Sequence, residues 1–125
     1  MEFKENKAIY LQIADRLCNE ILQQKYAEDE RVPSVREYAA EVEVNVNTMM
    51  RSYEYLQLQE IIYNKRGIGY FVSPGAKEQI YTSQKDNFMK EELNEFFKQI
   101  YLLDIPIDKI IEMYKEYCNK QSNNE

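Results

Sequence analysis

The sequence predicts a mostly helical fold with a small β-hairpin wing, in which a winged helix-turn-helix head precedes a C-terminal two-helix hairpin. Two segments, residues 32–36 and 45–53, each place an arginine shortly after a polar stretch that can begin a helix. A Gly-x-Gly turn at residues 67–69 then separates two apolar, β-prone runs. Two short helices with polar N-termini and a following hairpin are the parts of a winged helix-turn-helix, so DNA is the first ligand to consider.

The first helix is predicted over residues 8–24, where isoleucine and leucine recur at helical spacing. Cys18 lies beside this stripe and is expected to be buried as a small apolar residue. Neither Cys18 nor Cys118 has a Cys or His at metal-ligand spacing, and the chain has no histidine, so we expect no metal site and no cofactor. Two widely separated cysteines fit a reducing, cytoplasmic setting. No signal segment and no membrane-spanning run is expected.

The second and third helices are predicted from their capping signals. Ser34 and Glu37 form a capping-box pattern that begins a helix ending near Val42. Asn45 is the next good N-cap, and the helix that it begins should end near Gln59. The second helix should bury Val35, Tyr38 or Ala39, and Val42, and the third should bury Met49, Ser52, Tyr53 and Leu56.

A β-hairpin completes the predicted head, and a segment that interrupts regular secondary structure follows it. Residues 61–63 and 70–72 are short β-prone runs on either side of a glycine-containing turn. Ser-Pro-Gly at residues 73–75 interrupts the pattern. We therefore predict a DNA-binding domain over residues 1–75 and a helical dimerisation region over residues 76–125.

The C-terminal region is expected to form two helices, over residues 77–103 and 107–117, and to fray over residues 119–125. Its apolar surface is wider than a small helical hairpin can bury within itself. Because symmetric pairing is the commonest way to cover such a surface, we predict a homodimer. The residues expected in its interface are Phe88, Leu93, Phe96, Phe97, Ile100, Ile110, Ile111 and Tyr114.

The charge distribution favours nucleic acid more than the net charge does. The chain carries −6 overall, yet residues 31–77 hold six basic against five acidic residues. The acidic excess lies in residues 1–30 and 78–125. The electrostatic attraction to DNA should therefore be modest and concentrated in the predicted head.

Residues 9–72 resemble the DNA-binding domain of the GntR family of bacterial transcription regulators. Pro33–Glu37 is similar to that family's Leu-Pro-Ser-x-Arg segment, and Asn45–Tyr53 to the Asn-Pro-Asn-Thr-x-x-Arg-Ala-Tyr of its YtrA-like subfamily. Arg66–Val72 resembles the family's Arg-Gly-x-Gly-Thr-Phe-Val wing. The short C-terminal part also resembles that of this subfamily. Members of the subfamily lack a large ligand domain and dimerise through their short C-terminal part.

The sequence departs from the family pattern at three places. Val46 stands where the family usually has proline, and Glu60 where it usually has glycine at the end of the third helix. The glycine that normally precedes the Leu-Pro-Ser segment is absent from residues 27–31. None of these positions is a predicted DNA contact, so the departures concern local loop geometry.

The expected DNA contacts come from the two helix N-termini and the wing. Asn47 and Thr48 are the best candidates to read base edges, because asparagine suits adenine and a threonine methyl suits thymine. The full set is Ser34, Arg36, Asn47, Thr48, Arg51, Lys65, Arg66, Gly67 and Gly69.

Each contact has a purely structural alternative. In this alternative, Ser34 does no more than cap its helix, and Lys65 and Arg66 do no more than keep a hairpin tip soluble. The two glycines are then needed only for the backbone conformation of the turn. The two arginines can pair with side chains of their own helices: Arg36 with Glu37 or Glu41, and Arg51 with Glu54 or Tyr55.

The sequence thus predicts a sequence-specific transcriptional regulator, most simply a repressor, that binds a palindromic operator in double-stranded DNA as a homodimer. The alternative is a winged-helix module that binds proteins and has lost DNA binding, which the overall acidity permits. An enzyme is not predicted, because no nucleophile-elbow pattern, phosphate loop or metal cluster is present. A small-molecule effector of unknown identity is left open, and no membrane partner is expected.

Overall fold

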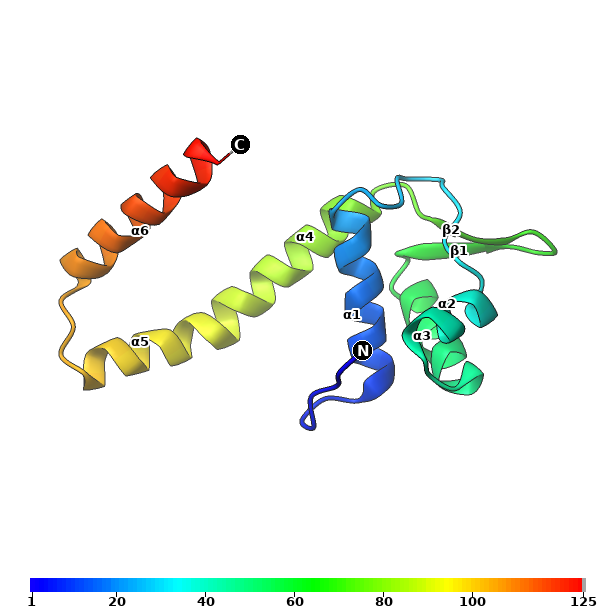
Figure 1. Cartoon of the computed structure of the whole chain (residues 1–125), viewed down its shortest axis with the longest axis horizontal. Helices are drawn as coiled ribbons and strands as arrows, with labels where there is room; N and C mark the ends of the chain where they lie inside the picture. Colours follow the sequence, from blue (N-terminus) through cyan, green and yellow to red (C-terminus); the bar gives the residue numbers. More distant parts are fainter. Residues whose placement is uncertain (125) are drawn as a thin grey trace. The chain divides into compact units, whose positions relative to one another are not determined.

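The computed structural model describes residues 1–124 and divides into two compact units, Met1–Ser83 and the residues from Gln84 onward. The first unit has the predicted winged helix-turn-helix architecture, and the mostly helical fold class is confirmed (Figure 1). Its elements are α1 (Ile9–Leu22), α2 (Val35–Val42), α3 (Val46–Leu58), β1 (Ile62–Lys65), β2 (Gly69–Val72) and the start of α4 (Ala76–Asn87).

The helices α2 and α3 begin where the capping signals predict. Ser34 caps α2 in a complete capping box, and the Asn45 side chain accepts a hydrogen bond from the Asn47 N–H at the start of α3. The predicted buried faces of both helices are confirmed. Cys18 is buried as expected, and burial raises the pKa of its thiol to about 12.

The wing is a two-stranded sheet, and the segment before α2 joins its free edge through an isolated bridge. β1 and β2 pair antiparallel, with Ile62 opposite Val72. The segment before α2 pairs with the other edge of β2, where the Val32 N–H donates to the Tyr70 carbonyl at 3.0 Å and the Val72 N–H to the Glu30 carbonyl at 2.9 Å. The start of α2 is therefore fixed directly beside the wing.

The first unit extends beyond the predicted boundary at Gly75. Ala76 and Ile80, on the first turns of α4, are buried in the same core as α1 and β2. Their side chains complete the head, so the division into units follows Ser83. A Ser-Pro-Gly break ends a strand but does not show whether the next helix packs back on the core.

Four non-glycine residues of the head have left-handed backbone conformations: Gln24, Asp29, Glu43 and Glu60. Asp29 has a φ of 65° and Glu60 a φ of 61°. Both lie where the sequence departs from the GntR pattern by lacking a glycine. The turns are thus preserved without glycine, at the energetic cost that a Cβ has in this region.

Replacing Glu60 by glycine is expected to raise the free energy of unfolding by about 0.5–1 kcal/mol, because glycine adopts positive φ without the Cβ penalty. Chemical denaturation measures the change. The matched control is Gln57→Gly, inside α3, which should lower the stability by about 1 kcal/mol. A destabilised Glu60→Gly variant would contradict the assignment of strain to this turn.

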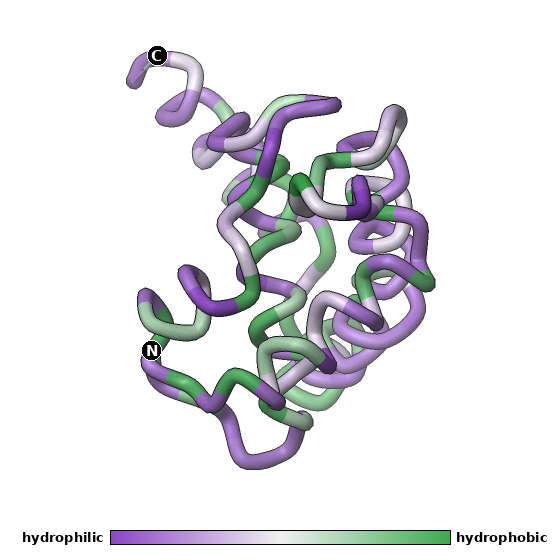
Figure 2. Tube along the Cα trace, turned by 90° about the vertical axis from the view of Figure 1, so that its right-hand side faces the viewer, coloured by the Kyte–Doolittle hydropathy of each residue, from purple (hydrophilic) through white to green (hydrophobic). Residues whose placement is uncertain are grey.

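The second unit contains a π-helical turn (Phe88–Glu92), α5 (Leu93–Leu102) and α6 (Ile107–Asn123). None of the described residues in these three elements is buried. Along the Cα tube of the chain, hydrophobic and hydrophilic residues alternate (Figure 2). Such alternation is typical of amphipathic helices. Among the described residues, each helix is either too short or too polar to span a bilayer.

The prediction of a frayed tail is wrong for most of its length. α6 continues to Asn123, and Asn124 is its C-cap, while Glu125 lies outside the described residues. Polar residues such as Lys120 and Gln121 are good helix formers, so the helix continues past its last apolar residues.

Candidate nucleic-acid interface

The N-terminus of α2 presents a hydroxyl and an arginine to solvent. Ser34 Oγ accepts the Glu37 N–H at 3.1 Å, and Glu37 Oε1 accepts the Ser34 N–H at 3.1 Å. The hydrogen bonds from Ser34 hold the pKa of Glu37 below its usual value. The Ser34 hydroxyl still has its own proton to donate, so capping and an additional contact are compatible.

Arg36 is exposed in the first turn of this helix. Among the described residues it forms no ion pair, so the alternative pairing with Glu37 or Glu41 is not observed. A free guanidinium beside a helix N-terminus is well suited to an anionic group, because the helix dipole and the arginine attract the same charge.

A buried tyrosine sets the position of α2 relative to α3. The Tyr53 hydroxyl donates to the Pro33 carbonyl at 2.6 Å, one residue before the N-cap of α2. The Tyr53 ring meets the Tyr70 ring edge-on, with 5.0 Å between the ring centroids. One side chain of α3 therefore contacts both the start of α2 and the wing strand β2.

The first turn of α3 presents the predicted base-reading residues. Asn47 is exposed and Thr48 is half-buried. The Asn47 backbone N–H donates to Asn45 Oδ1 at 2.7 Å. The Asn47 side chain takes no part in this cap and is accessible to a ligand because the residue is exposed. The Thr48 carbonyl accepts the Ser52 hydroxyl at 3.3 Å, so the backbone of this turn does not depend on the Thr48 side chain.

Arg51 follows one turn later and does not pair with Glu54 or Tyr55. Its guanidinium lies over the ring of Tyr10, which belongs to α1, with Cζ 4.1 Å from the ring centroid. Sequence reasoning could not find this contact, because the two residues are far apart in the chain and no motif links them.

The wing turn carries two adjacent basic side chains, Lys65 at the end of β1 and Arg66 directly after it. Arg66 is exposed, and Lys65 Nζ lies 4.6 Å from the centroid of the Phe71 ring. Gly67 has a φ of +81° with open space around it, so the turn conformation is what requires glycine there. Gly69 has a φ of +146°.

Gly69 also makes room for a basic side chain. A Cβ at this position would lie 2.8 Å from Nε of Arg31. Arg31 in turn lies 3.9 Å from Glu37 at the start of α2. The structure thus brings the wing, Arg31 and the α2 N-terminus together, a contact between segments that no local sequence pattern indicates.

The predicted interface residues of the second unit are accessible in the single chain. Phe88, Phe96 and Phe97 are exposed by 41–48%, and Ile111 by 45%. Tyr114 is exposed by 67%. The remaining three, Leu93, Ile100 and Ile110, are half-buried.

Comparison with known proteins identifies a family that matches the head and relatives that are similar to the chain. Residues 9–72 match the family described as "Bacterial regulatory proteins, gntR family". Two Bacillus subtilis proteins are similar over nearly the whole chain. The uncharacterized HTH-type transcriptional regulator YhcF is 33% identical, covering 93% of this chain and 94% of YhcF. The HTH-type transcriptional repressor YtrA is 28% identical, covering 90% and 86%.

Solved structures extend the likeness to the whole fold. A putative transcriptional regulator of the GntR family from Bacteroides thetaiotaomicron is 58% identical, with a TM-score of 0.79 over 91% of this chain and 99% of that one. The DNA-binding domain of AraR, solved in complex with operator ORR3, is 26% identical. It has a TM-score of 0.52 over 58% of this chain and 86% of the AraR chain.

Proposed function

Because the chain belongs to the GntR family of bacterial transcription regulators, we propose that it is a repressor that binds a palindromic operator as a homodimer. Proteins of this family are DNA-binding regulators and not enzymes. The relative YtrA is named a repressor, which supports the proposed sign of regulation.

The observation that carries the proposal is the arrangement of the head. The N-termini of α2 and α3 are both capped, and the Tyr53–Pro33 hydrogen bond links the body of α3 to the start of α2. The wing is paired to the segment before α2. We assign base reading to Asn47 and Thr48 in the major groove. Backbone contacts are assigned to the remaining polar residues of the predicted contact set, which are Ser34, Arg36, Arg51, Lys65 and Arg66. Gly67 and Gly69 allow close approach of the wing.

The homodimer is supported by the second unit. Its apolar side chains on α5 and α6 are left accessible, and no described residue of these helices is buried. A two-fold dimer presents two copies of α3 to successive major grooves. The operator should then contain two inverted half-sites about 34–36 Å apart, or a multiple of that spacing.

Selection of bound duplexes from a random pool, with the full-length protein, tests the proposal. We expect enrichment of an inverted repeat with the half-site spacing given above. A reporter gene placed behind the selected site should fall in expression when the protein is present. Enrichment of a single half-site would contradict the dimeric arrangement, and increased reporter expression would contradict repression. Failure to enrich any sequence would favour a protein-interaction module.

Arg36→Ala and Arg66→Ala are expected to weaken binding to the selected operator and to random duplex alike. Each arginine is proposed to neutralise a phosphate, so each loss should reduce the slope of log K against log salt by about 0.9. Fluorescence anisotropy at several salt concentrations measures both quantities. Lys120→Ala in the second unit is the control for removal of one positive charge. A loss confined to the operator, with an unchanged salt slope, would contradict a backbone role.

A further inference from the structure

Arg51 is held by an aromatic side chain from another helix. Its guanidinium lies 4.1 Å from the centroid of the Tyr10 ring, within the range of a favourable cation–π contact. The Tyr10 ring in turn meets the Tyr55 ring edge-on, with 6.1 Å between the ring centroids. Tyr55 thus packs against the ring on which the arginine lies. No carboxylate of the described residues forms an ion pair with Arg51.

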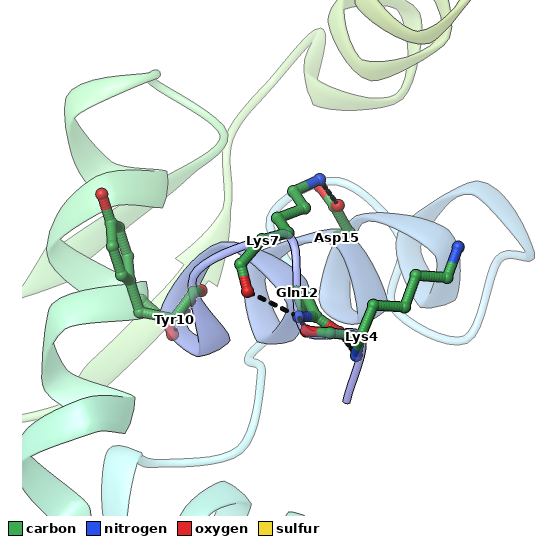
Figure 3. Close-up of polar contacts among 6 residues, drawn as sticks. Lys4, Lys7, Tyr10, Gln12 and Asp15 are labelled. Atoms are coloured by element: carbon green, nitrogen blue, oxygen red, sulfur yellow. Dashed lines mark hydrogen bonds and ion pairs between the residues drawn. The ribbon is translucent and has the colours of Figure 1, made fainter. Parts of the chain in front are cut away.

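The turn of α1 that carries Tyr10 is fixed on both sides. The Ser52 hydroxyl of α3 donates to the Tyr10 carbonyl at 2.7 Å. On the other side, the Gln12 amide bridges to the residues before α1: Oε1 accepts the Lys4 N–H, and Nε2 donates to the Lys4 and Lys7 carbonyls, each at 2.8 Å (Figure 3). Tyr10 is therefore presented to α3 from a well-anchored position.

Stacking leaves the hydrogen-bonding edge of a guanidinium unused. The five N–H donors lie in the plane of the group, whereas the ring contacts its face. An arginine held in this way can still form a bidentate contact with a phosphate or with the edge of guanine. Because its rotamer is restricted beforehand, less side-chain entropy is lost on binding.

We infer that Tyr10 is a positioning residue that holds the Arg51 guanidinium ready for an in-plane acceptor on DNA. The inference rests on the proposed function and assigns a DNA-binding role to a residue of α1 that itself need not touch DNA. Phosphate and guanine offer the same in-plane acceptor chemistry, and comparison of operator with random duplex distinguishes them.

A double-mutant cycle tests the inference. Tyr10→Leu removes the ring, Arg51→Ala removes the guanidinium, and the double variant combines them. Tyr10→Phe is the conservative control that keeps the ring. Dissociation constants are measured for the selected operator and for random duplex, and thermal unfolding is followed for each variant. If Tyr10→Leu unfolds at the assay temperature, Tyr10→Met replaces it, because methionine packs adaptably and lacks an aromatic ring.

We expect Tyr10→Leu to weaken operator binding about twofold to fivefold, as loss of an exposed cation–π contact predicts, and Tyr10→Phe to stay near wild type. In the Arg51→Ala background, Tyr10→Leu should have no further effect on affinity. An equal loss on random duplex identifies phosphate as the acceptor, and a loss on operator alone identifies a base.

Three results would overturn the inference. Tyr10→Leu could bind as tightly as wild type while Arg51→Ala binds weakly, or the two losses could simply multiply in the double variant. Arg51→Ala could also leave DNA binding intact, which would make the stack a structural link between α1 and α3. Failure of the wild-type protein to bind any duplex would instead overturn the proposed function, and the inference with it.

Discussion

Ile111→Glu is expected to convert the full-length protein from a dimer to a monomer and to abolish tight operator binding. Ile111 lies in the apolar stripe of α6 and is accessible in the single chain. If a second chain covers this stripe, the new carboxylate is buried without a partner, which costs several kcal/mol. Phe96→Glu on α5 should act in the same way. Light scattering at micromolar concentration measures the mass of each variant.

The control for added charge is Asn119→Glu, on the side of α6 that already carries Glu112 and Glu116. This variant should remain dimeric, since Asn119 is exposed and separate from the apolar stripe. A monomeric wild-type protein, or an Ile111→Glu variant that is still a dimer, would contradict the proposed interface.

The same interface can be removed by truncation, and the structure determines where to cut. A chain ending at Gly75 would lose Ala76 and Ile80, both buried in the head core, and so would test folding as much as dimerisation. A chain ending at Ser83 keeps both residues. We expect it to be a folded monomer whose operator affinity is much weaker than that of the full chain.

Local signals made the head largely predictable from sequence. The Ser34–Glu37 capping box and the Asn45 cap fix the starts of α2 and α3, and the period of the apolar residues gives their buried faces. Such signals act within one or two helical turns. They are therefore visible in the sequence without knowledge of the tertiary structure.

The features that sequence reasoning missed depend on contacts between distant segments or on backbone detail. The stacking of Arg51 on Tyr10 and the approach of Arg31 to Gly69 join elements that no local pattern connects. The π-helical turn at Phe88–Glu92 has the same amphipathic composition as an ordinary helix. Composition likewise did not show that α6 continues through its polar end.

Asn47→Ala combined with Thr48→Ala is expected to relax the base preference of the protein with little loss of stability. Each lost base contact should cost about 1–3 kcal/mol of discrimination. Neither side chain is part of the buried core, and the hydrogen bonds of this turn to Asn45 and Ser52 involve backbone atoms of residues 47 and 48. Selection of duplexes with the double variant should therefore return degenerate half-sites, while binding to random duplex stays close to wild type.

Two single substitutions at Thr48 separate the roles of its methyl and hydroxyl groups. Thr48→Val keeps the branched apolar shape, and Thr48→Ser keeps the hydroxyl. If the methyl group contacts a thymine, only the valine variant should retain the preference at that position, because apolar contact with the C5-methyl needs no hydrogen bond. Gln57→Ala, near the exposed end of α3, is the control for substitution on the same helix. An unchanged selected site in the Asn47–Thr48 double variant would show that other residues read the bases, and Arg51 would then be the next candidate, since it lies one turn further along the same face.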